Sequence, residues 1–465
     1  MQPQPPANPG SPRKWWIFLA IGIGTFMSAL DGSVVNTILP VIRTFFSSDV
    51  AAVEWVVVIY LLVVSSLLLT FGRLGDLRGQ KTIYVSGFLI FIAASALCGL
   101  APTVTLLIVA RGVQAMGAAM LFANAPAILT KAFPPQQRGQ ALGMQATMTY
   151  LGLTAGPSLG GWLAQAYGWR SVFYINVPIG LIAFGLSLAF IQAEKPEAGR
   201  SERFDWAGAV LFSAGLVALL LGLNQGHAWG WTSPAILGCL VSALVLLGVF
   251  IRVEARTQHP MLDLSLFRQR IFSAGAASAL LNYICLYSVL FLMPFYLIQG
   301  RGLNPAQAGL LLTAQPLVMA VAAPLSGSLS DRIGSRLLST LGMAILAVGL
   351  FMLSRLDGSS GNPAILGSLA VTGLGTGMFI SPNTSALMGS APRQRQGIAS
   401  GILASARNVG MVLGIGLAGA IFTSVIAVQG DAGLYDAVHL GLLAGAAVAV
   451  LGVVVSSTRG GKTPA

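Results

Sequence analysis

Three charged residues lie inside long apolar runs of this 465-residue chain: Asp31, Arg111 and Arg407. Charged side chains are costly in the interior of a membrane, so those that occur there usually mark a functional site. A carboxylate can take up and release a proton, whereas an arginine stays charged. The residue types therefore predict that Asp31 carries a proton and that Arg111 tunes it.

The positions of Asp31 and Arg111 support this pairing. Asp31 lies about nine residues, and Arg111 about seven, from the outer ends of their apolar runs, which places both roughly 10–14 Å below the outer surface. Burial favours the protonated carboxyl, whereas a nearby arginine favours the ionised one, so a carrier needs two states in which each effect prevails. A purely structural ion pair is the alternative.

Two further charged residues form a second tier of candidates for proton coupling. Glu54 lies next to an apolar run at the outer interface, where a solvated side chain is the simpler interpretation. Arg407 lies about ten residues into the run at 397–428, near mid-depth. A packing or snorkelling arginine is the alternative there.

The sequence lacks the patterns of a metal enzyme or a nucleotide-driven pump. His227, His259 and His439 lie in separate loops, and the three cysteines have no metal-binding spacing. GGKT at 460–463 ends like a phosphate loop, but Ser456 occupies the position of the first glycine and no strand precedes it. We therefore expect no catalytic residue, metal, cofactor or nucleotide, with the proton as the coupling ion.

Composition predicts that these residues lie on membrane-spanning helices. Only 9% of the residues are charged, against about 25% in soluble domains, and 55% are hydrophobic. A spanning helix needs about 20 mostly apolar residues. Fourteen such runs occur, at 16–40, 55–72, 82–101, 104–126, 139–164, 171–191, 206–224, 234–251, 272–298, 307–329, 337–354, 363–387, 397–428 and 437–457.

The distribution of basic residues predicts the orientation of these spans. With a cytoplasmic N-terminus, most of the 26 lysines and arginines fall in cytoplasmic segments, and the outer segments hold Arg43, Arg170, Arg301 and Arg355. The net charge of +12 is then an orientation signal and not a nucleic-acid patch. We expect a plasma (inner) membrane protein with both termini cytoplasmic and an extracellular tip at 226–232.

Two internal matches indicate duplication. GRLGDLRG at Gly72 matches GSLSDRIG at Gly327, and the segment 139–161 matches 397–419 at nearly the same offset. The predicted fold is an all-α polytopic membrane protein with two six-helix bundles and two extra helices between them. A cytoplasmic loop in place of the extra helices is the alternative. The predicted regions are a disordered tail at 1–14, bundles at 15–192 and 256–458, the insertion at 193–255 and a tail at 459–465.

Four motifs carry a family resemblance: LDGSVVNTILP (30–40), GRLGDLRGQK (72–81), ARGVQAMGAA (110–119) and GLTAGPSLGG (152–161). The chain resembles the major facilitator superfamily, in its fourteen-helix drug:proton antiporter branch of the EmrB/QacA type. The resemblance implies that the second motif is a conformational switch in which Asp76 caps the helix beginning near Gly397. An ordinary solvated turn is the alternative. The switch residues are Gly72, Arg73, Gly75, Asp76, Arg78, Gly79 and Lys81.

The fourth motif resembles the helix that marks antiporters. Its residues are Gly152, Gly156, Pro157, Gly160 and Gly161. Small residues let membrane helices approach closely, and proline can bend a helix. We expect a packed seam at the domain interface that limits proton leak, with plain helix packing as the alternative.

The resemblance also implies a substrate cavity and a function. The candidate cavity residues are Asn36, Gln114, Asn124, Asn282, Tyr283, Tyr287, Phe379 and Asn383. The expected function is proton-coupled efflux of small amphipathic compounds by a monomer in contact with membrane lipid, and a facilitator or importer is the alternative. Because Asp31 is the one acid within the spans, a neutral or singly cationic substrate fits better than a dication.

Overall fold

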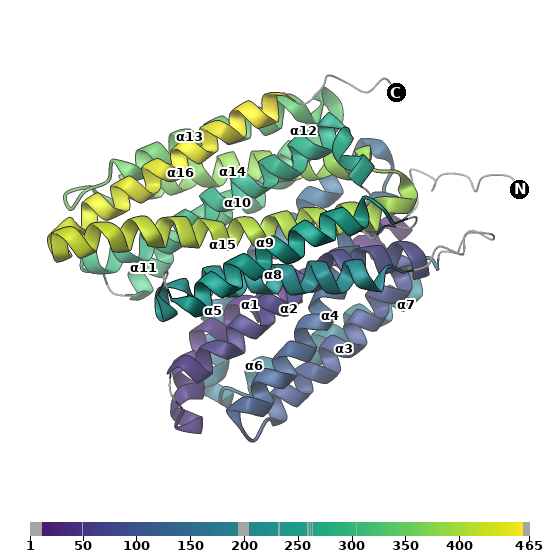
Figure 1. Cartoon of the computed structure of the whole chain (residues 1–465), viewed down its shortest axis with the longest axis horizontal. Coiled ribbons are helices and arrows are strands. Elements are labelled where there is room, and N and C mark those ends of the chain that lie inside the picture. The colour runs from purple at the N-terminus through teal and green to yellow at the C-terminus, as the bar shows by residue number, and fades with distance from the viewer. Residues whose placement is uncertain are drawn as a thin grey trace, which may run out of the picture.

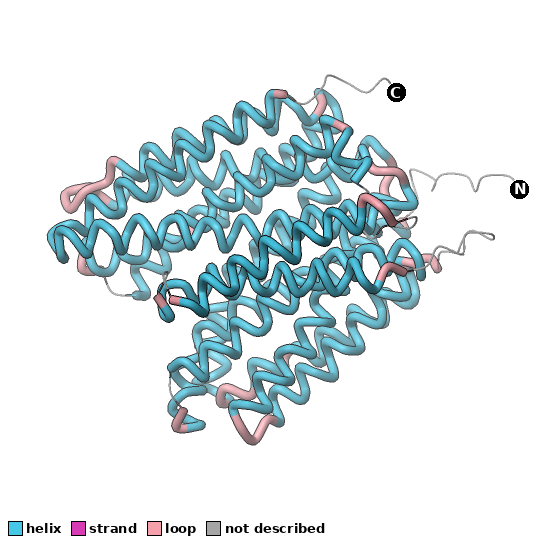
Figure 2. Tube along the Cα trace, viewed as in Figure 1, coloured by secondary structure: helices cyan, strands magenta, loops and turns pink. Residues whose placement is uncertain are grey.

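The chain folds entirely into helices and loops within the part that the structure describes (Figure 2). This computed structural model describes residues 12–48, 50–193, 204–230, 233–257, 260, 262, 264–303 and 305–458. The predicted tail at 1–14, the linker around 194–203, the end of the hairpin tip at 231–232 and the tail at 459–465 lie wholly or mostly outside these residues.

The α-helices follow one another with short connections. They are α1 (Arg13–Phe46), α2 (Val50–Arg78), α3 (Gln80–Leu100), α4 (Val104–Ala132), α5 (Arg138–Tyr167), α6 (Ser171–Tyr174), α7 (Asn176–Phe190), α8 (Trp206–Trp229), α9 (Pro234–Glu254), α10 (Arg270–Pro294), α11 (Pro305–Leu312), α12 (Ala314–Ile333), α13 (Ser335–Ser354), α14 (Asn362–Ser390), α15 (Gln396–Gln429) and α16 (Leu434–Ser457). A π-helical turn at Phe295–Gly300 extends α10.

Thirteen of the described helical segments are long and apolar enough to cross a membrane. The run predicted at 139–164 is not among them, although α5 is 30 residues long. This helix is rich in glycine, threonine and glutamine, and it packs against both α1 and α12. A helix enclosed by other helices needs less apolar surface than one that faces lipid. The all-α membrane fold is confirmed, and the count of fourteen spans stays a prediction.

The helices form two groups joined by a hairpin. Helices α1–α7 form one group and α10–α16 the other, while α8 and α9 pack against each other and α8 also contacts α2 and α15 (Figure 1). The two groups lie close together at one end and diverge toward the other, and α1 begins and α16 ends at the close end (Figure 1). The hairpin thus lies along the seam between the groups.

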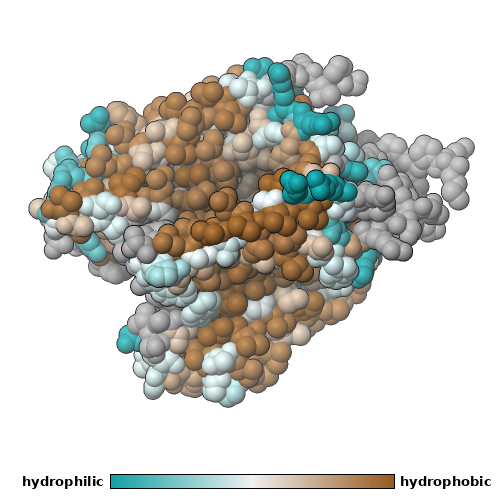
Figure 3. Space-filling view, viewed as in Figure 1, coloured by the Kyte–Doolittle hydropathy of each residue, from teal (hydrophilic) through white to brown (hydrophobic). Residues whose placement is uncertain are grey.

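The outer surface suits a lipid environment. A broad apolar band covers the helices, with polar residues gathered toward the two ends (Figure 3). Large apolar side chains face outward on this band, among them Leu244, which is 77% exposed, and Leu310, which is 72% exposed. In water such a patch would mark an interaction surface, and in a bilayer it is the expected exterior.

Candidate proton site and cytoplasmic caps

The structure brings Asp31 on α1 and Arg111 on α4 together, as their depths in the spans predict. The guanidinium Nη1 donates to Asp31 Oδ2 at 2.6 Å. Arg111 Nε also donates to the carbonyl of Val56 on α2, at 3.3 Å. Asp31 and Arg111 are 0% and 1% exposed, so this is a fully enclosed ion pair.

Polar side chains from three helices complete the contacts of the carboxylate. Gln114 Nε2 and Asn176 Nδ2 both donate to Asp31 Oδ1, at 3.0 and 2.8 Å. The same two nitrogens lie 3.2 and 3.1 Å from the hydroxyl of Ser95. Arg111 donates to Gln114 Oε1 at 2.7 Å, which fixes the orientation of that amide. Each oxygen of the carboxylate thus has at least one hydrogen-bond donor.

The remaining groups around the pair are aromatic or weakly polar. The Arg111 guanidinium lies 4.2 Å from the ring centroid of Tyr60 on α2 and 5.8 Å from that of Phe173. Cys98 Sγ on α3 lies 3.7 Å from Gln114 Oε1. The titratable groups that face Asp31 are therefore Arg111, Tyr60 and Cys98, and α7 contributes the uncharged Asn176.

Three members of this site were not predicted from the sequence to belong to it. Gln114 had been assigned to the substrate cavity, but the structure places it, 0% exposed, beside the carboxylate. Asn176 and Ser95 were not singled out at all. A polar residue within an apolar run is a weak signal, because serine and asparagine also satisfy backbone groups in membrane helices.

At the close end of the molecule, Asp76 on α2 caps the N-terminus of α15. Its oxygens accept hydrogen bonds from the backbone nitrogens of Gly397 and Ile398, at 2.7 and 2.9 Å. Gln80 Nε2 approaches Asp76 Oδ1 at 3.3 Å. The first N–H groups of a helix lack internal partners and carry partial positive charge, so a carboxylate stabilises them. The capped helix is the one that the resemblance implied.

A second cap mirrors the first. Asp331 on α12 accepts hydrogen bonds from the backbone nitrogens of Gly139 and Gln140 at the start of α5, at 3.0 and 3.2 Å. Each cap joins a helix of one group to a helix of the other. The internal matches indicate this second cap, because they align Asp331 with Asp76 and Gly139 with Gly397.

Glycine pairs allow these contacts. A Cβ on Gly72 would collide with the carbonyl of Gly397, and a Cβ on Gly327 would collide with that of Gly139. Backbones that approach this closely exclude any side chain. Both pairs lie beside their caps, which explains why glycine begins each copy of the repeat.

The other switch residues have local structural contacts. Gly79, at φ +92°, connects α2 to α3, as Gly334, at φ +91°, connects α12 to α13. Lys81 Nζ donates to the carbonyl of Leu188 at 2.8 Å. Gly75 packs against the amide of Asn124, Arg73 is buried and Arg78 is exposed.

The glycines of the fourth motif do not pack at the interface between the groups. A Cβ on Gly152, Gly156 or Gly160 would collide with α1, in the same group. Gly161 has no atom within 4 Å of such a Cβ, and the side chain of Pro157 is not among those described. The glycines of α5 that do face the other group lie earlier in the helix: Gly139 against Gly327, and Gly143 against Ala323 and Pro324 of α12. The expected seam is thus a seam within one bundle.

Most of the predicted cavity residues lie in contacts between helices. Asn124 donates to the carbonyls of Phe71 and Met120, and Asn383 donates to that of Gly275. Buried amides need such partners in an apolar surrounding. Four predicted residues are thereby only 0–1% exposed and are not open to a substrate in this conformation: Asn124, Asn282, Phe379 and Asn383.

Two of the predicted cavity residues are not fully buried in this conformation. Tyr283 and Tyr287 on α10 are partly exposed and lie near Arg407. The side chains of Asn36 and Glu54 are outside those that the structure describes, so these two candidates stay predictions.

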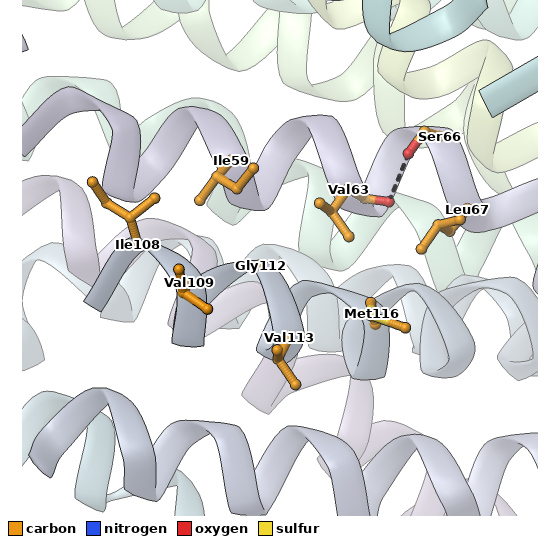
Figure 4. Close-up of a pocket in the computed structure, with 9 residues that line it drawn as sticks. All are labelled: Ile59, Val63, Ser66, Leu67, Ile108, Val109, Gly112, Val113 and Met116. Atoms are coloured by element: carbon orange, nitrogen blue, oxygen red, sulfur yellow. Dashed lines mark hydrogen bonds between the residues drawn. The ribbon is translucent and has the colours of Figure 1, made fainter. Parts of the chain in front are cut away.

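An apolar groove lies between α2 and α4, close to the ion pair (Figure 4). It has a volume of about 460 Å³, and Gly112 in its wall follows Arg111 in sequence. The hydroxyl of Ser66 in the wall donates to the carbonyl of Val63 at 3.2 Å. The lining therefore offers apolar contacts and no charged group.

Comparison with known proteins identifies relatives over nearly the whole chain. The model of the Major Facilitator Superfamily matches residues 21–253 and 275–463. Riboflavin transporter RibZ of Clostridioides difficile is 36% identical over 86% of this chain and 87% of its own length. Multidrug resistance protein Stp of Mycobacterium tuberculosis is 33% identical over 87% of this chain and 75% of its own length.

A solved structure agrees with the fold. That of the human organic anion transporter MFSD10 (TETRAN) superposes with a TM-score of 0.69 over 96% of this chain and all of that chain, at 13% sequence identity. Similarity at this level of identity supports the fold alone.

Proposed function

Because the chain belongs to the major facilitator superfamily, we propose that it is a secondary active transporter that exports small amphipathic or lipophilic compounds in exchange for protons. It works in the plasma (inner) membrane with both termini cytoplasmic. The observation that carries the proposal is the buried pair of Asp31 and Arg111, which joins a titratable carboxylate to a fixed positive charge inside the membrane.

The proposed cycle depends on breaking and re-forming this pair. With the contacts in place, Asp31 is ionised. When the halves rearrange and the amides or Arg111 withdraw, desolvation favours the protonated carboxyl. Alternating access by movement of one repeat against the other supplies the two states. One carboxylate implies one proton per cycle, and each pH unit then contributes about 1.4 kcal/mol.

The caps belong to the same cycle. The basic-residue distribution supports a cytoplasmic position for the close end of the molecule. Asp76 and Asp331 then hold the cytoplasmic side shut, and the conformation seen here is the one open toward the outside. Substrate uptake from the cytoplasm requires both caps to release.

The experiment compares Asp31→Asn with the wild-type protein. Efflux in a pump-deficient host, across a panel of neutral, cationic and anionic amphipathic compounds, first identifies a transported compound. The purified proteins are then placed in liposomes with a pH difference across the membrane. We expect the wild type to concentrate that compound and Asp31→Asn to lose uphill transport while keeping downhill exchange.

A control variant tests whether the effect is specific to Asp31. Asp357→Asn changes an exposed carboxylate in the loop after α13 and should leave transport unchanged. Uphill transport by Asp31→Asn at the wild-type rate would show that Asp31 is not the carrier. Glu54 would then be the next residue to test.

A second function rests on the named relatives. Riboflavin transporter RibZ is as similar to this chain as the multidrug protein, so an importer or facilitator of a small metabolite is the alternative. The same liposomes separate the two, because an importer driven by protons accumulates substrate on the side to which protons flow.

A further inference from the structure

Arg407, near the middle of α15, is a partly exposed arginine within the spans. Its guanidinium reaches across from the second group to Phe122 on α4 of the first, 5.1 Å from the ring centroid. Unlike Arg111, it has no carboxylate partner among the described residues. Arginine does not lose its proton in proteins, so a positive charge without a counter-charge remains between the halves.

Phenol groups surround this charge. The hydroxyl of Tyr283 on α10 lies near the guanidinium. Tyr287, one helical turn further along α10, and Tyr150 on α5 also lie near Arg407. The cluster thus draws side chains from four helices and from both groups, so relative movement of the groups would change it.

The cluster is accessible, whereas the acidic site is not. Its four central side chains are each partly exposed, although they lie in the middle of their helices: Arg407, Tyr283, Tyr287 and Phe122. Asp31 is 0% exposed, and both of its oxygens accept hydrogen bonds from Arg111 or the amides. Among the described side chains, a substrate entering between the halves in this conformation therefore meets a cation and aromatic rings and no open carboxylate.

We propose that Arg407 and these tyrosines form a subsite for an aromatic monoanion, such as an aryl carboxylate or a phenolate. The guanidinium pairs with the anionic oxygens, for which its planar donors are suited. The hydroxyls of Tyr283 and Tyr287 donate to the same oxygens, and the ring of Phe122 packs against the aromatic part. This assignment rests on the proposed export function and names its substrate class.

The charge of the substrate has a consequence for the energy source. Export of a monoanion in exchange for one proton moves two elementary charges across the membrane in the direction that an inside-negative potential favours. A neutral substrate would move one charge, and a monocation none. Transport of the preferred class should therefore respond strongly to voltage.

The test uses three probes that share one ring system and differ in charge: naphthalene-2-carboxylate, naphthalene-2-carboxamide and 2-naphthylmethylammonium. Binding to the full-length protein in lipid nanodiscs is measured by calorimetry without a proton gradient. We expect the wild type to bind the carboxylate at least tenfold more tightly than the carboxamide, and the ammonium least tightly. Arg407→Gln should abolish the difference between carboxylate and carboxamide while leaving carboxamide binding within about twofold.

Further variants distinguish a loss of the anion subsite from misfolding of the protein. Arg407→Lys keeps the charge and should retain a preference for the carboxylate, and Tyr283→Phe keeps the ring and should weaken carboxylate binding selectively by about threefold. Arg355→Gln is the matched control, because that arginine also stacks on a phenylalanine, Phe351 at 4.8 Å, but lies exposed outside the spans. It should leave all three affinities unchanged.

Two results would overturn the assignment: equal or weaker binding of the carboxylate by the wild type, or an equal loss of all three probes in Arg407→Gln. Either result together with intact pH-driven efflux would leave the export function standing. Loss of pH-driven efflux with the charge preference intact would instead count against the export function alone.

Discussion

At the level of single residues, the state of Asp31 depends on how many donors it keeps. Arg111, Gln114 and Asn176 all donate to its oxygens in this conformation. A hydrogen bond to a charged group contributes about 1.5–3 kcal/mol, so removal of a single amide should be measurable. Asn176 is the clearest choice, because its nitrogen contacts only Asp31 and Ser95 among the described side chains.

Asn176→Ala should shift the pH dependence of efflux. Loss of a donor weakens the hydrogen bonding of the carboxylate, so the pH of half-maximal transport should move to a higher value. The measurement is the initial efflux rate in liposomes over a pH series. Asn383→Ala, which removes a buried amide bound to Gly275, is the control and should lower stability without moving the midpoint. An unmoved midpoint in Asn176→Ala would mean that this amide does not act on the proton site.

At the level of elements, α5 uses opposite faces for different neighbours. Gly143 faces α12 in the other group, and Gly152, nine residues later, faces α1 in its own group. Nine residues at about 100° each make about two and a half turns of helix. The two glycines therefore point in opposite directions. The low apolar content of α5 follows from packing on two sides.

Gly156→Ala should destabilise the protein, and Gly161→Ala should not. A Cβ on Gly156 would lie 2.9 Å from Ser33 Cβ and 3.1 Å from Val34 N, whereas one on Gly161 would have no atom within 4 Å. Overpacking of this kind costs about 1–3 kcal/mol. Thermal unfolding of the two purified variants measures the difference. If both unfold at the same temperature, the contact between α5 and α1 is not tight at Gly156.

At the level of the whole molecule, the two caps link the groups in both directions. Asp76 reaches from the first group to α15, and Asp331 reaches from the second group to α5. Each carboxylate contributes about 1 kcal/mol to the closed arrangement. Because the caps lie on separate helices, their contributions should add.

Asp76→Asn and Asp331→Asn should each shift the equilibrium toward opening of the capped end by about fivefold, and the double variant by about 25-fold. The measurement is the distance distribution between spin labels at Arg78 and Gln394, two exposed residues beside the Asp76 cap. Asp357→Asn is the control, because its carboxylate lies in an exposed loop. A double variant no more open than either single variant would contradict independent caps.

The orientation can be tested with single cysteines in a background without the three native ones. Ala235, exposed in the first turn of α9, lies beside the predicted extracellular tip, and Gln394 lies at the capped end. Because basic residues favour the cytoplasmic side, Ala235→Cys should react with an impermeant maleimide on intact cells, and Gln394→Cys only after permeabilisation. The reverse pattern would place the caps outside.

The sequence alone determined the properties that depend on local composition. Long apolar runs can only be buried or face lipid, so they gave the all-α membrane class, and the glycine-rich matches indicated the repeat. The rarity of charge within those runs marked Asp31, Arg111 and Arg407. Asp31 and Arg111 lie at similar depths below the outer surface of the membrane, because the helical rise per residue converts sequence position into depth. This similarity predicted that they share a site.

Tertiary packing decided which polar groups meet and which stay open. Asn176 reaches Asp31 across 145 positions of sequence, and no local pattern encodes that contact. The face that α5 turns to each neighbour, the partner of Asp331 and the burial of Asn383 also depend on how helices pack around one another. Packing also sets the exposure of these charges, since Asp31 is enclosed while Arg407 is partly exposed. Sequence fixes which charges enter the membrane, whereas desolvation and pairing, which exist only in the folded molecule, decide which of them a substrate meets.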